Sequence, residues 1–404
     1  MNELNRVTVY LESLGCPKNL VDSEVMLGLL EEAGCTITSN PAQAQVIIVN
    51  TCGFIADAQQ ESINTILRLA NYREKGLAKL LVATGCLPQR FAPELGRELP
   101  EIDVMVGTGE FHRIVDLIKE SLHGRKVTRI APPFFLYDHT WPRRLSTPAH
   151  YAYVKVAEGC DNRCSYCSIP DIRGSFRSRD TGSILAEAER LAAGGVKEII
   201  LVAQDTSRYG EDFYGQPQLA MLLRRLCAIP EIKWVRWLYG YPTRITDELV
   251  QVMAEEPKIC PYIDLPLQHV AAGILRRMQR PADPVATRRL LRKLKKVIPR
   301  LALRTSFIVG FPGETEDDFK LLLDFAEEVE FDWLGVFTYS RETGTVAAEL
   351  KGEVAEEVKE ERYHRLMQQQ QLISLRCNQR WVGRSTMVLV EGFQDGLAYG
   401  RSQR

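Results

Sequence analysis

Three closely spaced cysteines are the residues in this chain best suited to chemistry. Cys160, Cys164 and Cys167 form a C-x3-C-x2-C pattern. Thiolates placed this close together suit a single metal centre. A closed four-iron cluster or a structural zinc site uses four protein ligands, whereas this run supplies three. The spacing therefore predicts a metal centre with one open position for a substrate or cofactor.

A structural zinc site is the alternative to a cluster. Closed zinc sites need a fourth ligand, and the next cysteine, Cys227, lies 60 residues beyond Cys167. The pattern therefore favours an iron-sulfur cluster over zinc.

Three further cysteines share a different placement, each one following an apolar, β-rich run. Helix-like periodicity fills residues 22–33 and 57–72 between these runs, so the strands should be parallel. The carboxyl ends of parallel strands meet at one edge of a sheet, where α/β folds bind ligands. The pattern predicts a second cysteine site at that edge. The runs and their cysteines are 7–10 with Cys16, 46–51 with Cys52, and 80–85 with Cys86.

The remaining four cysteines show no such placement and are assigned to packing. They are Cys35, Cys227, Cys260 and Cys377.

A second series of strand and helix patterns begins at residue 151. Six strands, each followed by a helical segment, are too few for a closed eightfold barrel and fit a partial one, (β/α)6. In such barrels chemistry sits at the carboxyl ends of the strands. The predicted strands are 151–156, 198–202, 235–239, 262–265, 304–309 and 334–338. Their carboxyl ends carry the cysteine triplet, Gln204, Asp205, Tyr241, Gln268, His269, residues 310–314, Tyr339 and Ser340.

The predicted fold class is α/β. A small parallel α/β domain spans 1–128, and a proline-containing linker without periodicity spans 129–149. The partial barrel spans 150–378, ending in a charged helix from about residue 354. Residues 379–404 begin a β segment that is too short for a free-standing domain.

Composition indicates an intracellular enzyme. The chain has 404 residues, 45% of them hydrophobic, and a net charge of −1. The amino terminus lacks the apolar stretch of a signal peptide, and no window approaches the roughly 20 apolar residues of a membrane span. We therefore expect a cytoplasmic protein with no membrane partner, in which cysteines act as ligands or core residues.

Lysines and arginines crowd residues 276–300, where Asp283 is the only acid. Such a run is usually a solvated helical face, and an interaction surface for ribosomal RNA or an acidic protein segment is the alternative.

The triplet at the end of the first barrel strand resembles the radical S-adenosylmethionine superfamily, and the three upstream cysteines narrow the resemblance to the methylthiotransferases. The resemblance implies a [4Fe-4S] cluster on Cys160, Cys164 and Cys167, whose open iron binds S-adenosylmethionine. It also implies an auxiliary [4Fe-4S] cluster on Cys16, Cys52 and Cys86. The first would generate a 5'-deoxyadenosyl radical and the second would present a methylthio group, with two S-adenosylmethionine molecules used per turnover. The two cysteine edges must then face each other.

Within that family, three segments look like the RimO-type enzymes, which methylthiolate the β-carbon of an aspartate in small-subunit ribosomal protein S-twelve. A tRNA adenosine substrate, as in MiaB-type relatives, is the nearest alternative, and an iron-sulfur sensing protein without turnover is a second. The resemblance implies the ribosomal protein and an electron donor such as flavodoxin or ferredoxin as partners. The segments are 239–242, 264–269 and 339–345.

The chain departs from the family in two places. Where many radical enzymes carry Gly-Gly-Glu after the second barrel strand, this chain has Ala203-Gln204-Asp205, and we expect Gln204 or Asp205 to hold the methionine moiety. Gly310 and Tyr339 are further expected cofactor contacts, although a tight turn capped by Thr315 would equally explain the glycines of residues 310–313. The second departure is the carboxyl terminus, where only the beginning of a TRAM-like β module is present.

Overall fold

The computed structural model describes residues 4–280 and 283–404. Contacts group them into two compact units. The amino-terminal unit runs as far as Thr147 and also takes in Glu158–Asp161 and Ser168–Ile184. The barrel unit comprises Pro148–Ala157, Asn162–Cys167 and Leu185–Arg404. The domain limits at residues 128, 149 and 378 stay predictions.

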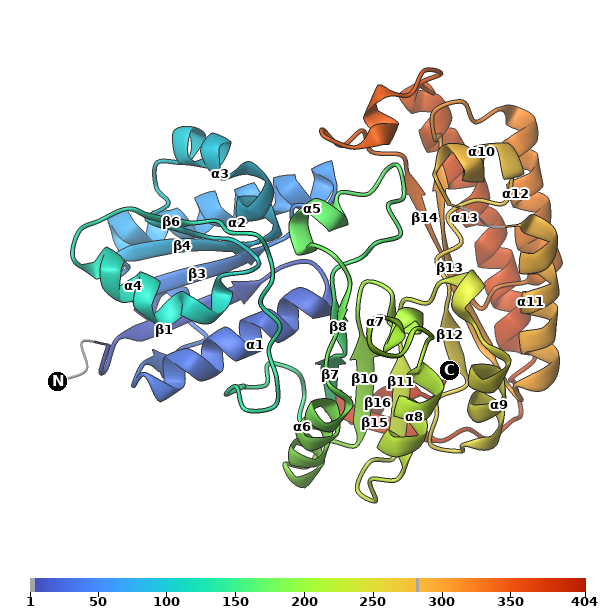
Figure 1. The fold of residues 1–404 in the computed structure, drawn as a ribbon, viewed down its shortest axis with the longest axis horizontal. Helices are drawn as coiled ribbons and strands as arrows, with labels where there is room; N and C mark the ends of the chain where they lie inside the picture. Colours follow the sequence, from blue (N-terminus) through green and yellow to red (C-terminus); the bar gives the residue numbers. More distant parts are fainter. Residues whose placement is uncertain (1–3, 281–282) are drawn as a thin grey trace. The chain divides into compact units, whose positions relative to one another are not determined.

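The amino-terminal unit is built on a parallel sheet with the strand order β2-β1-β3-β4-β5-β6. Helices α2 and α3 cover one face, and α1 and α4 cover the other (Figure 1). The strands are β1 (Thr8–Ser13), β2 (Thr36–Ile37), β3 (Val46–Thr51), β4 (Leu80–Gly85), β5 (Val104–Val106) and β6 (Val127–Arg129). The helices are α1 (Pro17–Glu32), η1 (Pro41–Gln43), α2 (Ala56–Lys75), α3 (Cys86–Glu98), η2 (Phe111–Arg113) and α4 (Ile114–Leu122).

The central strands of this sheet form because they are apolar on both faces. Every residue of β3 and β4 is buried, as expected for parallel strands with helices on both sides. Ile47 and Leu81 pack against Ile66 of α2 and Leu95 of α3 in one core cluster. This core fixes the strand ends that precede Cys52 and Cys86.

The barrel unit holds the six predicted barrel strands in chain order. They form two parallel sheets, β11-β10-β7 and β12-β13-β14, joined by a single bridge between Val235 and Ile259. The arc is therefore partial, as predicted. The strands are β7 (Tyr151–Lys155), β10 (Glu198–Val202), β11 (Trp234–Trp237), β12 (Tyr262–Asp264), β13 (Ala302–Val309) and β14 (Trp333–Thr338).

The longer helices of the barrel unit line the outer side of this arc (Figure 1). The longer ones are α8 (Leu219–Cys227), α9 (Asp247–Glu255), α11 (Pro284–Val297), α12 (Glu316–Val329) and α13 (Glu356–Gln379). The shorter ones are η3 (Thr206–Arg208), α7 (Glu211–Tyr214), η4 (Pro242–Arg244), α10 (Ala272–Arg277) and η5 (Val346–Glu349). Helix α6 (Thr181–Ala193) precedes β10, while β8 (Ala157–Glu158), α5 (Ile169–Arg173) and β9 (Arg177–Ser178) flank the cysteine triplet.

The predicted α/β class is confirmed, and one helix start is corrected. The periodicity placed the first helix from residue 22, whereas α1 begins at Pro17. Proline is favoured in the first turn of a helix because its missing N–H would have no partner there. Cys16 is consequently the N-cap residue of α1.

The segment between β6 and β7 has no helix or strand but is firmly packed in the amino-terminal unit. The Phe135 ring stacks on His112 with centroids 4.0 Å apart, and Trp141 meets Phe135 edge-on at 5.0 Å. Arg143 forms a buried ion pair of 2.5 Å with Glu24 of α1. The predicted linker is thus held along its length by specific contacts.

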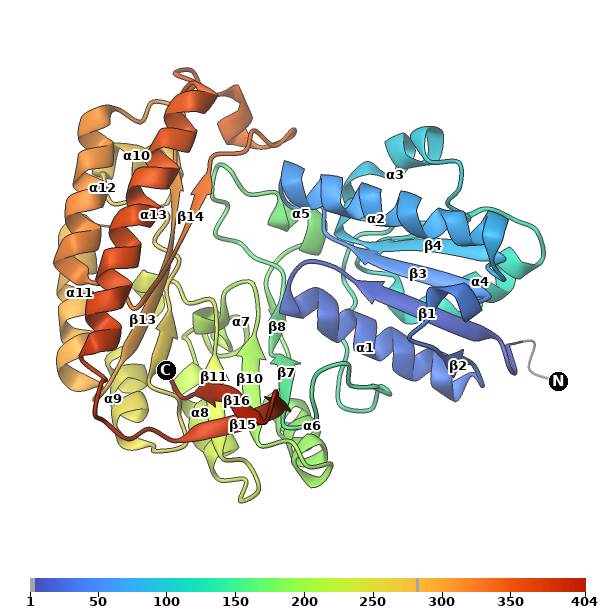
Figure 2. The same ribbon diagram turned by 180° about the vertical axis from the view of Figure 1, so that it is seen from behind.

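The carboxyl-terminal hairpin of β15 (Val388–Gln394) and β16 (Leu397–Ser402) lies against the barrel strands β10 and β11 (Figure 2). Arg401 pairs with Glu198 at 2.9 Å, and Arg236 donates a hydrogen bond of 3.1 Å to the carbonyl of Gln403. The expected β segment is therefore present and anchored by charge. None of the helices described is long and apolar enough to cross a bilayer.

Candidate functional site: two cysteine triplets

The first triplet lies at one edge of the amino-terminal sheet, as the strand pattern predicted. Cys16 follows β1 and is the N-cap residue of α1. Cys52 directly follows β3, and Cys86 follows β4 as the first residue of α3. Gly15 has a φ of +81°, and a Cβ there would lie 2.9 Å from the Cys52 Cβ and 3.2 Å from its Sγ. Only glycine lets the Cys16 loop approach Cys52 this closely.

Asn19 ties the three cysteine loops together from the first turn of α1. Its Nδ2 donates to the carbonyl of Leu14 at 3.2 Å and to that of Thr51 at 2.9 Å. Its Oδ1 lies 3.6 Å from the Sγ of Cys86. One buried amide thus contacts the segment before each of Cys16 and Cys52, and Cys86 itself.

The pKa values of two of these thiols, Cys52 and Cys86, are raised. Burial raises the pKa of Cys52 to about 11, with the neighbouring Cys86 and Cys16 adding to the rise. Burial also raises the pKa of Cys86, against which the Arg173 guanidinium acts. Among residues 4–280 and 283–404, no three His, Cys, Asp or Glu side chains already have the spacing of a metal site. The thiols are neighbours with soft donor atoms, which fits an iron-sulfur centre that displaces their protons on binding.

The second triplet occupies the loop between β8 and α5. Gly159 has a φ of +80°, and a Cβ there would overlap the backbone carbonyls of Gly174 and Ser175. The Cys160 N–H donates to the Gly174 carbonyl at 3.0 Å. The start of the loop, at Gly159 and Cys160, is therefore held against Gly174 and Ser175, which follow α5.

The other end of this loop is fixed within the barrel unit through Ser165. Its N–H donates to the Met278 carbonyl at 2.9 Å, and its Oγ donates to the Arg277 carbonyl at 2.8 Å. The Ser165 carbonyl accepts from the Ala347 N–H at 2.7 Å. Three hydrogen bonds to distant segments thus position the residue that follows Cys164.

Cys164 has a buried cation beside it. Arg280 Nη1 lies 3.6 Å from the Cys164 Sγ, and Arg280 is 6% exposed. Its guanidinium also lies over the Tyr241 ring, 4.2 Å from the centroid. Burial, then the adjacent Cys164, raises the pKa of Tyr166 well above its usual value. This donor set and its positive neighbour fit a cluster that carries net negative charge.

Asp205 is placed beside this loop and accepts three hydrogen bonds from protein donors. Its Oδ2 accepts from Asn162 Nδ2 at 2.9 Å and from Arg244 Nη1 at 3.2 Å, and its Oδ1 accepts from Ser207 Oγ at 2.6 Å. Asp205 is therefore suited to holding Asn162, between Cys160 and Cys164, in place. Gln204, its half-buried neighbour, stays the other predicted contact for the methionine moiety.

The glycine turn after β13 has a structural cause. Gly310 has a φ of +72°, and a Cβ there would run into Lys359 of α13. Thr315 caps α12 in a reciprocal capping box with Asp318. The turn explains the glycine pattern, and a contact between Gly310 and a cofactor stays a prediction.

His269 is packed inside the barrel unit. Its Nδ1 accepts from the Ala271 N–H at 3.0 Å, and its Nε2 lies 3.6 Å from Glu314 Oε2. Glu314 in turn accepts from Arg362 at 2.9 Å. His269 thus lies between the loop after β12 and the turn after β13, and within the described chain its Nε2 has no hydrogen-bond partner.

Tyr339 carries a polar atom that fits a ligand. The residue is 5% exposed, and within the described chain its hydroxyl has no hydrogen-bond partner. Its ring meets Phe311 edge-on at 5.2 Å and belongs to an apolar cluster against which Tyr166 packs. Buried hydroxyls normally find a partner, so this one is available to a bound molecule.

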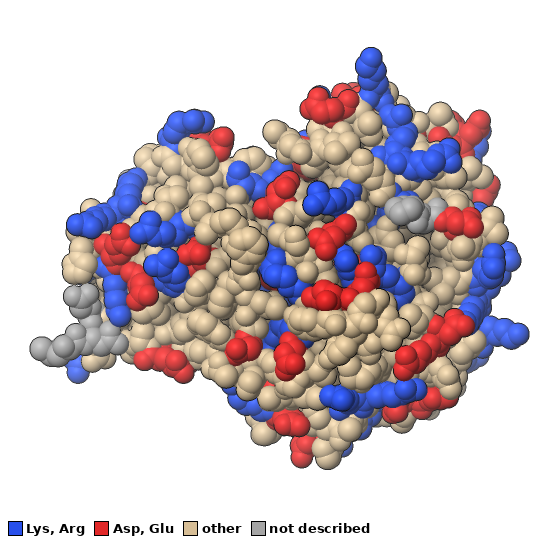
Figure 3. All heavy atoms as spheres, in the orientation of Figure 1, with Lys and Arg blue, Asp and Glu red and all other residues tan. Residues whose placement is uncertain are grey.

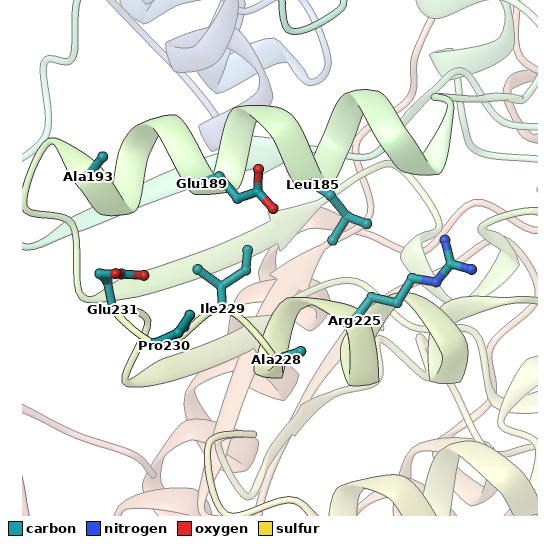
Figure 4. Close-up of a pocket in the computed structure, with 8 residues that line it drawn as sticks. All are labelled: Leu185, Glu189, Ala193, Arg225, Ala228, Ile229, Pro230 and Glu231. Atoms are coloured by element: carbon teal, nitrogen blue, oxygen red, sulfur yellow. The ribbon is translucent and has the colours of Figure 1, made fainter.

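One hollow described in the barrel unit has a volume of about 640 Å³. It is formed between α6 and the end of α8 with the segment that follows (Figure 4), and no cysteine lines it. Its charged residues are Glu189, Arg225 and Glu231, with Leu185 and Ile229 as apolar walls. Acidic and basic side chains are intermixed over the face drawn in Figure 3. Neither this hollow nor the distribution of surface charge indicates a further site of chemistry.

Three residues at these sites escaped the sequence reasoning. Asn19 and Arg173 have no pattern of their own, because their partners lie far away in the sequence. Arg280 belongs to the basic run of residues 276–300, which the sequence predicts to be solvated, but its side chain is buried. Other members of that run do lie at the surface, where Arg288 and Arg292 pair with Glu328, both at 2.8 Å.

Comparisons with known proteins agree with this geometry. Residues 8–107 match an uncharacterised protein family, UPF0004, and residues 154–326 match the radical SAM superfamily. The ribosomal protein uS12 methylthiotransferase RimO of Desulforamulus reducens is 55% identical over 98% of this chain and 90% of its own length. RimO of Geobacter sulfurreducens is 52% identical over 98% and 90%.

Among solved structures, the radical S-adenosylmethionine methyltransferase TsrM from Kitasatospora setae, with cobalamin and a [4Fe-4S] cluster bound, has a TM-score of 0.60 at 16% identity. That match covers 85% of this chain and 74% of TsrM. At this identity the likeness shows the fold.

The partial barrel with its cysteine triplet defines a radical S-adenosylmethionine enzyme. The relatives that share about half of their residues with this chain, over nearly its whole length, belong to one group of these enzymes. The chain belongs to the RimO family of methylthiotransferases.

Proposed function

We propose that this chain is a cytoplasmic enzyme that transfers a methylthio group to the β-carbon of an aspartate in ribosomal protein uS12. The observation that carries the proposal is identity of 48–55% to uS12 methylthiotransferases, in a chain that holds two separate cysteine triplets. No feature of the described chain favours a tRNA substrate or a sensor without turnover.

The cofactor assignments follow from the two triplets. Cys160, Cys164 and Cys167 hold the [4Fe-4S] cluster that binds S-adenosylmethionine. A second cluster is held by Cys16, Cys52 and Cys86. When bound, these groups supply one-electron cleavage of S-adenosylmethionine and a sulfur carrier. That the two triplets face each other stays a prediction.

The chain's own residues position and shelter this chemistry. Ser165 and Asn162 hold the cysteine loop through hydrogen bonds within the barrel unit, so these residues would keep the loop in one position when a cluster is bound. Tyr166 and Phe311 exclude water from one side of that loop, and the Tyr339 hydroxyl is available to donate to the cofactor. Electrons come from a partner such as flavodoxin or ferredoxin.

The roles of Gln204 and Asp205 can be separated experimentally. If Gln204 contacts the methionine moiety, Gln204→Ala removes one hydrogen bond of about 1 kcal/mol. S-adenosylmethionine should then bind roughly fivefold more weakly, with iron content unchanged. Asp205→Ala should instead lower the iron retained, because Asn162 of the cysteine loop loses the acceptor of its Nδ2 and keeps only the bond that its Oδ1 accepts from Arg244. Equilibrium binding and iron assays check both, and equal losses of iron in the two variants would contradict the division of roles.

The substrate is tested by deleting the gene in its own organism. Mass spectra of the ribosomal proteins should show uS12 without its methylthio group, and spectra of tRNA nucleosides should be unchanged. Re-expression of the intact chain should restore the uS12 modification, and a chain carrying Cys160→Ala should not. Loss of a methylthio group from a tRNA nucleoside, with uS12 unaltered, would overturn the substrate assignment.

A further inference from the structure

A buried arginine reaches the first cysteine triplet from the segment that follows the second. Arg173 is the last residue of α5, six positions beyond Cys167, and belongs to the amino-terminal unit. Its Nη2 lies 3.6 Å from the Cys86 Sγ, and the same nitrogen donates to Asn19 Oδ1. Arg173 thus contacts a proposed cluster ligand and the amide that ties the three cysteine loops together.

Hydrogen bonds of its side chain and of the neighbouring backbone hold Arg173 in place. Nη1 donates to Asp22 Oδ2 at 2.6 Å and lies 3.3 Å from Glu158 Oε2. The carbonyl of Ile172, the preceding residue, accepts from Thr108 Oγ1 at 2.5 Å. Arg173 is only 2% exposed, so water does not screen its charge. Its guanidinium is a fixed positive charge directly beside a thiol of the first triplet.

Two buried carboxylates share this site with Arg173. Asp22 and Glu158 are 3% and 4% exposed, and both carboxylates contact the Arg173 guanidinium. Three thiolates on a cluster would add further negative charge. Buried anions need a compensating cation, and hydrogen bonds to cluster sulfurs shift reduction potentials. Among the described residues, Arg173 contacts both of these carboxylates and also the Cys86 sulfur.

We propose that Arg173 is a positioning residue of the auxiliary cluster, which donates an N–H to the Cys86 sulfur and raises the reduction potential of that cluster. The inference rests on the proposed second cluster. An added electron makes the cluster more negative, and the nearby guanidinium stabilises that state. Asp22 acts in the opposite direction, because its carboxylate disfavours the added electron.

The test uses the full chain carrying Cys160→Ala, Cys164→Ala and Cys167→Ala, so that only the auxiliary cluster remains. After anaerobic reconstitution, the midpoint potential is measured by a redox titration followed by electron paramagnetic resonance. Arg173→Gln should shift the potential to more negative values, and Asp22→Asn should shift it to more positive values. The double variant should return towards the parent, because the two charge changes compensate.

Two further variants keep the test decisive if Arg173→Gln folds poorly. Arg173→Lys keeps the charge and loses the forked geometry, so its potential should lie between those of the parent and Arg173→Gln. Arg143→Gln breaks a buried ion pair of the same kind with Glu24 in the same unit, and should leave the potential near that of the parent.

The outcomes separate this inference from the proposed function. Equal potentials in the parent, Arg173→Lys and Asp22→Asn would overturn the electrostatic role and reduce Arg173 to a structural ion pair. Shifts of the same sign in Arg173→Gln and Asp22→Asn would also overturn it. If the parent chain retains no iron-sulfur cluster at all, the auxiliary cluster itself is refuted, and the inference falls with it.

Discussion

Replacing Cys160 with alanine is expected to abolish the cleavage of S-adenosylmethionine to 5'-deoxyadenosine. The variant leaves two thiolates at the second triplet, too few to retain a four-iron cluster with one open position. Iron should fall from about eight to about four per chain, because the first triplet is untouched. Product formation under dithionite and iron content per chain are the two measurements.

Cys260→Ala is the matched control. Cys260 is a fully buried thiol of the barrel unit, and we assign it to packing. The variant should keep both its iron and its 5'-deoxyadenosine formation. About four irons in the intact protein, instead of about eight, would disprove the two-cluster proposal.

Replacing Cys86 with alanine should separate radical formation from sulfur transfer. The second triplet remains complete, so S-adenosylmethionine should still be cleaved to 5'-deoxyadenosine. Transfer of a methylthio group to uS12 should fall to background, because the auxiliary cluster loses one of its three ligands. Iron should again fall by about half. Mass spectrometry of uS12 after incubation with the reconstituted variant is the direct measurement.

Cys35→Ala controls for the loss of a thiol in the same unit. Cys35 is 7% exposed, lies just before β2 and is assigned to packing. Its alanine variant should modify uS12 as the parent does. Full methylthio transfer by Cys86→Ala would show that the first triplet carries no essential cluster.

The cysteine edge of the amino-terminal unit was predictable because it depends on periodicity. Buried strands such as β3 and β4 read as continuous apolar runs, and parallel strands must end at one edge. The position of Cys52 follows directly from these two rules. The start of α1 was missed because residues 17–21 are too short and mixed in polarity to show a helical period.

The residues that tune the two sites could not be predicted in this way. Arginine is almost never fully buried unless it is paired, so a sequence gives no reason to place Arg173 or Arg280 inside. Only the fold shows that Arg173 lies 3.6 Å from Cys86, a residue 87 positions earlier. Asp205 was identified by its place at a strand end, but its engagement with Asn162 and Arg244 depends on side-chain geometry.

The anchoring of Ser165 sets an order of events during synthesis of the chain. Its loop is held by the carbonyls of Arg277 and Met278 and by the N–H of Ala347, which leave the ribosome long after the cysteines themselves. The first triplet and its Arg173 partner are complete once residue 173 has emerged. The contacts of Arg173 with the first triplet can therefore form while the barrel is still being made, whereas the contacts of Ser165 need residue 347.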